Sequence, residues 1–420
     1  MSISYVCRKC KKNYSKTEND QNGVCTVCGS FLLATFNKEA PGLPTIQEKN
    51  QTVEKAHTEK MALYRAAEGL RQRVEQTKEY GVVSEKEAAP QKLPIFESWI
   101  WSTEYEAALK FEKQLLKQYR GKTIEKTFPG RVVSNEHGEC YETSSSCFVK
   151  FKKVTYEESR QIMISNLRVL PGIGQVSERA LKKQGYKTIE DLEHHPRWKI
   201  QAHKYMKLID AKEVDATQKW LWQRLPKSHP LLHYLAGFCQ DHDFAIVDIE
   251  TLGLSERPII LLGIAKPTKD HICTTQFLLR DIPDEPSAIF ALIAQLEPNL
   301  SLITYNGKNF DIPYIKQRLA YYGIDSHIDN LNFDILHFTR RALKAKLINC
   351  RLETVESYLG IKREINIPGA LVPHFYDTYL RTKNVGPLVP IVEHNRQDLL
   401  TLGTLFSKLY EEWPIDRAIH

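Results

Sequence analysis

The 420-residue sequence contains no uninterrupted apolar run of 18 residues, and its opening, MSISYVCRKCKKNY, is unlike a secretory signal. We therefore expect a cytoplasmic protein with no membrane partner. In that setting the nine cysteines argue against a disulfide framework. Four of the nine fall in two CxxC pairs, which points to a metal instead.

Composition places the chain among soluble globular proteins, with 42% hydrophobic and 26% charged residues. Its length suits two or three domains. The net charge of +7 is only a weak sign of a polyanionic partner. The distribution of charge says more, because residues 161–225 carry 12 Lys or Arg against 7 Asp or Glu.

The two CxxC pairs are Cys7 with Cys10 and Cys25 with Cys28, separated by fourteen residues. Each pair can present two thiolates to one tetrahedral Zn²⁺, and the metal lets so short a segment fold. Four unrelated buried thiols are the alternative. A zinc ribbon of this kind indicates little about function, since such ribbons bind nucleic acid or protein, or only stabilise a chain end.

The segment NLRVLPGIGQVSERALKKQGYKTIEDL predicts a helix that ends near Leu170, a tight PGIG turn, a helix over residues 175–184, and a third helix capped by Thr188. This pattern resembles the helix-hairpin-helix motif, which usually binds DNA without reading its sequence. The resemblance implies that the turn around Gly172 and Gly174 offers backbone N–H groups to a phosphate. Lys182, Lys183 and Lys187 could add electrostatic contacts. A helical connector with ordinary turn glycines remains the alternative.

Strands are predicted at FAIVDIE, PIILLGIAK, ICTTQFLL and SLITYNG, and helices at PSAIFALIAQLE, DIPYIKQRLAYYGI, RLETVESYLGI and HNRQDLLTLGTLFSKLYEEW. Three strands in a row followed by a helix, a strand and a helix are typical of a mixed sheet covered by helices. The first strand carries Asp248 and Glu250 on one face, where two carboxylates repel each other. A positive charge between them would remove that repulsion.

Two further acids follow in the same region. Asp311 begins a predicted helix, and Asp398 lies one turn after His394 in another. Each has an ordinary structural explanation. Asp311 could be an N-cap ahead of Pro313, His394 and Asp398 could be a surface pair, and Asp248 could face solvent at a strand end.

The stretches DIETLGL, YNGKNFDIPYIKQR and HNRQD occur in order and resemble the three motifs of DEDD-type 3′–5′ exonucleases. Among these enzymes, the sequence most resembles the YprB-type RNase H-like exonucleases. The segments FDILHFTRRAL, RLETVESYLGI and IPGALVPHFYDTYL also resemble segments of that subgroup. The resemblance covers about the last 185 residues. It implies an α/β, RNase H-like fold, with a mixed five-stranded sheet flanked by helices.

The same resemblance implies two Mg²⁺ or Mn²⁺ ions held by four carboxylates. Asp248 would bridge both ions, Glu250 and Asp311 would serve one ion or its water shell, and Asp398 would serve the ion beside the attacking water. His394 would orient or deprotonate that water. The spacing departs from the two familiar layouts, one with Tyr and three intervening residues and one with His and four, because this chain has His with three.

Contacts with the terminal nucleotide follow from the same resemblance. They would come from the backbone around Thr251 and Leu252, with Gly253 allowing close approach. Asn306 and Gly307 would pack near the strand being cleaved, and Phe310 would support Asp311. Ordinary turn or core roles are the alternative for Asn306 and Phe310.

These features predict a metal-dependent 3′–5′ exonuclease that acts on nucleic acid, with DNA favoured over RNA. An RNA-trimming enzyme of the same fold and a catalytically weak nucleic-acid-binding protein are the alternatives. We expect five parts in the chain: a zinc ribbon (1–36), a linker with an exposed helix (37–93), a small α+β module (94–160), a helix-hairpin-helix region (161–230) and the exonuclease domain (231–420).

Overall fold

The computed structural model describes residues 2–7, 13–15, 32–37, 95–253, 256–268, 270–325, 327–363 and 367–413. The chain divides into two compact units, Met1–Gly69 and Leu70–His420. In the first unit, strands β1 (Ser2–Cys7), β2 (Asn13–Ser15) and β3 (Leu32–Asn37) form an antiparallel sheet in the order β2-β1-β3. Apart from the backbone of Cys7, the four cysteines lie outside the described residues, as does the expected linker, so the zinc ribbon stays a prediction.

The second unit is built on a seven-stranded sheet with the order β10-β9-β6-β7-β8-β5-β4. Strands β10, β9 and β6 are mutually parallel, and every other neighbouring pair is antiparallel. The strands are β4 (Gly130–Asn135), β5 (Gly138–Phe148), β6 (Phe244–Thr251), β7 (Ile259–Pro267), β8 (His271–Leu278), β9 (Ser301–Thr304) and β10 (Asn332–Asp334).

The expected count of five strands was wrong. The hairpin of β4 and β5 belongs to the segment predicted as a separate small module, yet β5 pairs with β8 from Tyr141 to Phe148. A pairing across more than a hundred residues leaves no local pattern in the sequence. The sheet that carries the predicted motifs therefore includes a hairpin from the first half of the chain.

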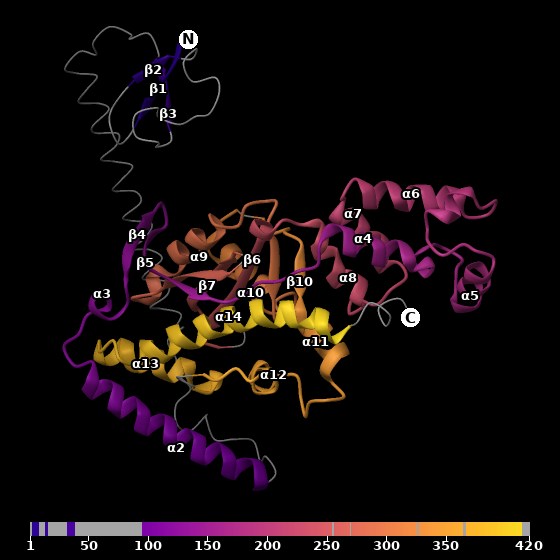
Figure 1. Cartoon of the computed structure of the whole chain (residues 1–420). Helices are drawn as coiled ribbons and strands as arrows, with labels where there is room; N and C mark the ends of the chain where they lie inside the picture. Colours follow the sequence, from indigo (N-terminus) through magenta and orange to yellow (C-terminus); the bar gives the residue numbers. More distant parts are fainter. Residues whose placement is uncertain are drawn as a thin grey trace. The chain divides into compact units, whose positions relative to one another are not determined.

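Helices cover both faces of this sheet (Figure 1). Residues of β6 alternate between two cores: Phe244 and Ile246 belong to one, and Ala245 and Val247 to the other. The helices outside the helix-hairpin-helix region are α2 (Ile95–Gln118), α3 (Ile124–Thr127), α8 (Pro230–Tyr234), α9 (Glu285–Ile293), α10 (Asp311–Tyr322), α11 (Ile335–Leu343), α12 (Leu352–Leu359), α13 (Val372–Thr382) and α14 (Leu388–Glu412). Short 3₁₀ turns are η4 (Leu235–Phe238), η5 (Asp241–Asp243), η6 (Ile282–Asp284) and η7 (Gly369–Leu371).

Helix α14 lies close against the sheet because two glycines allow it. A Cβ at Gly403 would come within 2.3 Å of Ile272, and a Cβ at Gly263 of β7 within 2.2 Å of the Asn395 side chain. Such distances leave no room for a methyl group. The helix that carries the third predicted motif is thereby held directly over β6 and β7.

The predicted helix-hairpin-helix region forms a helical module between β5 and β6 in the chain (Figure 1). It consists of α4 (Tyr156–Ser165), η2 (Leu167–Val169), α5 (Gln175–Lys183), η3 (Asp191–His194), α6 (Lys199–Asp210) and α7 (Val214–Trp222). The first helix ends earlier than expected, because the Asn166 side chain accepts from the N–H of Arg168 and starts a separate 3₁₀ turn. The expected third helix is also only a 3₁₀ turn, preceded by reciprocal bonds between Thr188 and Asp191.

Within the described residues, no helix is both long and apolar enough to cross a bilayer.

Candidate active site

Asp248 and Glu250 lie near the end of β6, on the face covered by α14. They alternate with Val247 and Ile249, which are buried in the core on the opposite face. The expectation that the two acids share one face is therefore confirmed. The register of β6 shifts between Glu250 and Thr251, so the strand becomes irregular immediately after the second acid.

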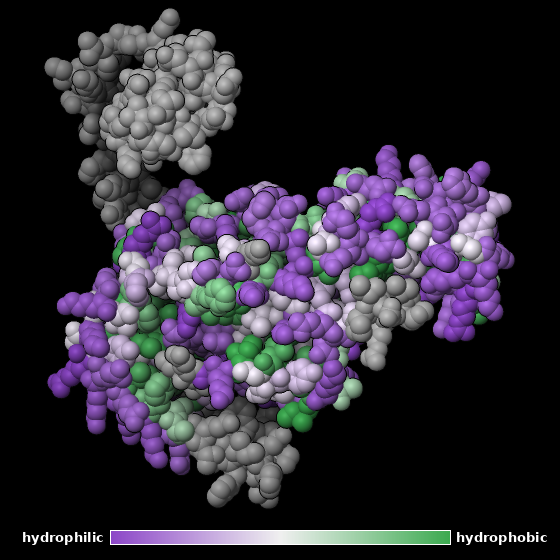
Figure 2. Space-filling model, in the orientation of Figure 1, coloured by the Kyte–Doolittle hydropathy of each residue, from purple (hydrophilic) through white to green (hydrophobic). Residues whose placement is uncertain are grey.

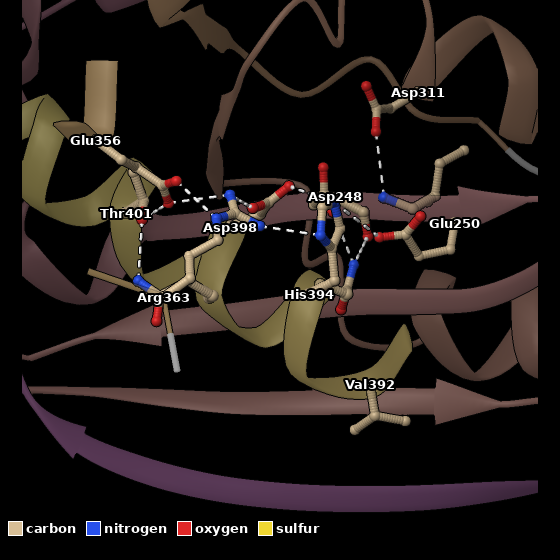
Figure 3. Close-up of polar contacts among 12 residues, drawn as sticks. Asp248, Glu250, Asp311, Glu356, Arg363, Val392, His394, Asp398 and Thr401 are labelled. Carbon is tan, nitrogen blue, oxygen red and sulfur yellow. Dashed lines mark hydrogen bonds and ion pairs between the residues drawn. The ribbon is translucent and has the colours of Figure 1, made fainter. Parts of the chain in front are cut away.

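The other predicted site residues come from two helices and converge on the same place (Figure 3). Asp311 is the first residue of α10, and its Oδ1 accepts a hydrogen bond of 3.3 Å from the N–H of Ile249. His394 and Asp398 lie one turn apart on α14, with 3.6 Å between His394 Nε2 and Asp398 Oδ2. Groups from three elements far apart in the sequence thus meet beside the end of β6.

The pKa values of the four acids report how closely they interact. Burial raises the pKa of Asp248 well above its usual range, and the charges of Asp398, Asp311 and Glu250 raise it further. The pKa of Glu250 is raised by burial and then by Asp398 and Asp311. Burial is also the main reason that the pKa values of Asp311 and Asp398 rise to about 7. The cluster therefore resists holding four negative charges without a compensating positive charge.

One such charge is Arg363, in the loop after α12, which no local sequence pattern singles out (Figure 3). Its guanidinium is held by Glu356 of α12 through bonds of 2.6 and 3.0 Å. It also donates to Asp398 and, over 3.0 Å, to Nδ1 of His394. Both side chains of the Arg363–Glu356 pair are almost inaccessible to solvent, and Thr401 donates a further bond of 2.6 Å to Glu356.

The contact with Arg363 determines which ring nitrogen of His394 carries the proton. A guanidinium has no acceptor, so Nδ1 must accept and the neutral ring carries its proton on Nε2. Burial and the nearby Arg363 lower the pKa of His394 to about 4, which keeps the ring neutral. In this arrangement Nε2 is a donor that lies 4.0 Å from Glu250 Oε1.

Asp248 is oriented by Asn395, which directly follows His394 in the HNRQD stretch. The Asn395 amide donates to the Asp248 carboxylate over 2.8 Å and to its backbone carbonyl over 3.1 Å. Gln276 of β8 in turn donates to the Asn395 carbonyl over 2.9 Å. Gly263 of β7 stands opposite both Asp248 and Gln276 in the sheet, so its missing side chain makes the space that Asn395 fills.

We expect Gly263→Ala to lower the free energy of unfolding by about 1–3 kcal/mol, because the added methyl group overlaps Asn395 and forces it away from Asp248. Urea unfolding measures this. Gly369→Ala is the matched control, since no atom lies within 4 Å of a Cβ there. Equal stabilities of the two variants would contradict the proposed packing.

The second predicted motif is held by Asp334, another residue that no local sequence pattern singles out. Its carboxylate accepts the N–H groups of Asn306 (2.9 Å) and Lys308 (3.1 Å) and lies at the N-terminus of α11. Asn306 itself has φ of +66°, which asparagine tolerates better than most residues. Asn306 therefore serves the turn, and Phe310 packs on Tyr314 one turn into α10.

The predicted nucleotide contacts after β6 form a compact turn. Thr251 donates to the carbonyl of Gly253 over 2.6 Å, and Leu252 donates to the carbonyl of Pro258 over 3.0 Å. The hydroxyl of Tyr314 donates toward the carbonyls of Gly253 (3.1 Å) and Arg257. This places the turn beside the first helical turn of α10, which Asp311 begins.

The predicted phosphate contacts of the helical module do not belong to the acid cluster. Gly172 has φ of +85° and thus needs glycine, whereas Gly174 has an ordinary φ of −98° and caps α5 without any side-chain bond. Lys183 is exposed, as is Lys187, but Lys182 is paired with Glu178 at 3.2 Å.

In the described part of the chain, no three His, Cys, Asp or Glu side chains are arranged to hold a metal ion. The donor set nevertheless fits a hard divalent cation, because four mutually repelling carboxylates converge there. Asp398 is engaged by Arg363 and Asp311 by the backbone of Ile249. Coordination by these acids would require at least Asp398 to exchange its arginine partner for the ion.

Comparison with known proteins gives three kinds of match. The uncharacterized protein YprB of Bacillus subtilis (strain 168) is 33% identical over 194 residues, which cover 44% of this chain and 46% of that protein. A solved structure of exonuclease I is 16% identical over 37% of this chain and 42% of its own, with a TM-score of 0.23. E. coli exonuclease I in complex with a 5cy-dA13 oligonucleotide is 16% identical over 38% and 45%, with a TM-score of 0.22.

The third match covers the acid cluster. Residues 245–410 match a family model of the RNase H superfamily, and this range runs from β6 through α14 and includes all four acids and His394. The mixed sheet flanked by helices agrees with that fold. Residues 245–410 thus form an RNase H superfamily domain.

Proposed function

We propose that this protein is a metal-dependent exonuclease that removes nucleotides from the 3′ end of a nucleic acid, with DNA favoured over RNA. The observation that carries the proposal is the convergence of Asp248, Glu250, Asp311 and Asp398 within an RNase H superfamily domain. Buried carboxylates that raise one another's pKa values destabilise a fold. Their gathering is explained if they serve a cation and a phosphodiester.

Two Mg²⁺ or Mn²⁺ ions bound by these acids would neutralise charge on the attacking and leaving oxygens. Asp248 would be a ligand shared by both ions, Glu250 and Asp311 would help to hold one of them, and Asp398 would help to hold the one beside the attacking water. Asn395 keeps the Asp248 carboxylate turned toward the cluster.

His394 is the proposed group that orients or deprotonates the water. With Arg363 on Nδ1, the ring can only donate from Nε2. Accepting a proton at Nε2 requires the other tautomer, in which Nδ1 carries the hydrogen and Arg363 has withdrawn. Release of Arg363 would thus prepare both His394 and Asp398 for catalysis.

The hairpin turn is the reason that DNA is favoured. Replacing Gly174 by alanine is expected to weaken oligonucleotide binding and to flatten its salt dependence, because a Cβ would obstruct a phosphate at the uncapped start of α5. The site of substitution has an ordinary φ and open space, so the fold should be unaffected. Combining it with Gly172→Ala should deepen the loss. Affinities that match the wild type at every salt concentration would remove the phosphate role.

The proposed function is tested with 5′-labelled single-stranded DNA and RNA, each incubated with Mn²⁺ or with EDTA. Shortening from the 3′ end that needs Mn²⁺ supports the exonuclease, and the preferred substrate separates DNA from RNA trimming. Binding without any shortening would favour the alternative of a catalytically weak nucleic-acid-binding protein.

A further inference from the structure

A cavity of about 550 Å³ lies between the helical module and the RNase H domain, away from the acid cluster. Its walls include Arg168 before the hairpin turn and Ile173 within it, Arg224 just after α7, Arg341 on α11 and Trp413 after α14. The described residues that line it include no Asp or Glu. We call this cavity the arginine pocket.

The positive charge of the arginine pocket is only partly compensated. Arg168 pairs with Glu178 at 3.4 Å. Arg224 makes a long bond of 3.5 Å to the carbonyl of Leu170, which carries no charge. Arg341 and Arg224 are exposed, and the structure pairs neither with a carboxylate in the part of the chain that it describes. Like charges gathered without counter-charges favour the binding of an anion.

A nearly buried histidine adds a further donor to the wall. His229 is 7% exposed, and its Nδ1 accepts from the N–H of Leu231 over 3.3 Å. Burial, together with Arg341 and Arg168, lowers its pKa to about 4, so at neutral pH the hydrogen is on Nε2. Among the described residues Nε2 has no hydrogen-bond acceptor. The pocket therefore offers guanidinium and imidazole donors and lacks an acidic acceptor.

We propose that the arginine pocket binds a phosphate group, supplied by the backbone of a nucleic acid strand. Guanidinium groups match phosphate oxygens in pairs, which makes phosphate a better partner than a simple halide. Ile173, in the hairpin turn itself, forms part of the wall, so a strand bound at that turn reaches the pocket directly. The visible face of the helical module is largely hydrophilic, which suits a charged rather than an apolar ligand (Figure 2).

This proposal rests on the proposed function only for the source of the phosphate. A free phosphate or a phosphorylated small molecule offers the same chemistry to the same donors. The experiment therefore has two arms, one with an oligonucleotide and one with inorganic phosphate.

The test compares the wild type with the double variant Arg224→Gln, Arg341→Gln in EDTA, which prevents cleavage. Fluorescence anisotropy follows the binding of a labelled single-stranded oligonucleotide over a range of salt concentrations. Loss of two phosphate contacts should reduce the slope of log Kobs against log salt by about 1–2. The charge-matched control is Lys113→Gln, Lys117→Gln on the exposed side of α2, which should leave the slope unchanged. The single variant Arg341→Gln, with a smaller loss, guards against misfolding of the double variant.

The second arm measures the melting temperature with and without inorganic phosphate. A reduced slope confined to the pocket variants supports a nucleic acid phosphate. An unchanged slope with loss of the phosphate-induced rise in melting temperature supports the same site with a free phosphate as its ligand. If neither quantity differs between the pocket variants and the lysine control, the proposal is overturned. Failure of the exonuclease proposal would be seen in the cleavage assay, as the absence of Mn²⁺-dependent shortening. The anisotropy and melting-temperature experiments could still be interpreted in that case.

Discussion

Asp248→Asn is expected to lower the rate of Mn²⁺-dependent cleavage by about 10³-fold, because the amide cannot supply the negative charge that the proposed metal-ligand role of Asp248 needs. Binding of an oligonucleotide in EDTA should stay close to that of the wild type. The substitution preserves shape, and its amide oxygen can still accept the bond that Asn395 now gives to the carboxylate. Single-turnover cleavage and anisotropy measure the two effects.

The same variant should be more stable than the wild type when no metal is present. Because the folded-state pKa of Asp248 is raised above its unfolded value, this group lowers the free energy of unfolding at neutral pH, and the loss disappears only as the pH falls below the unfolded pKa. Removing the charge should raise the melting temperature by about 2–6 °C and abolish most of the further rise produced by Mn²⁺. Asp325→Asn, at a fully exposed acid, is the control and should change neither quantity. A variant that is as active as the wild type would end the nuclease assignment.

Replacing Arg363 by methionine is expected to destabilise the metal-free protein by about 3–5 kcal/mol, because Glu356 and Asp398 then remain buried without their cation. Mn²⁺ should restore part of this loss, since the ion supplies positive charge to Asp398. The rise in melting temperature on adding Mn²⁺ should therefore be larger in the variant than in the wild type.

Arg318→Met is a matched control for that experiment. Arg318 is also almost fully buried, and it pairs across α10 and α9 with Glu285 at 2.6 Å. Its loss should destabilise the protein by a comparable amount without enlarging the effect of Mn²⁺. If Mn²⁺ stabilises the Arg363 variant no more than the wild type, Arg363 does not compete with the metal.

Local patterns in the sequence sufficed for much of the RNase H domain. The strand that carries Asp248 and the helix that begins at Asp311 lie where periodicity and capping indicated. The helix with His394 and Asp398 was also predicted, but it begins at Leu388 and not at His394. The position of Asp248 and Glu250 on one common face of β6 followed from the period of a strand. These features depend on neighbours within a few residues, which a single sequence displays.

Contacts between residues that are far apart in the chain could not be predicted from the sequence. Arg363 is one basic residue in a polar loop, and only the fold brings it between Glu356 and Asp398. Asp334 reads as an ordinary helix cap until its contact with the turn at Asn306 is seen. Asn395 lies in the HNRQD stretch, but no local sequence pattern links it to Gly263, whose missing side chain leaves the space that Asn395 occupies.

The pairing of β5 with β8 has a mechanical consequence. The helical module leaves the sheet after β5 and returns to it at β6, so both of its ends are attached to the same sheet. A module attached at one end could move over a large volume, whereas attachment at both ends restricts its movement. If the module binds a nucleic acid strand as proposed, the end of that strand would be held at a high local concentration near the four acids. Capture and cutting would be coupled by attachment alone, with no conformational signal between them.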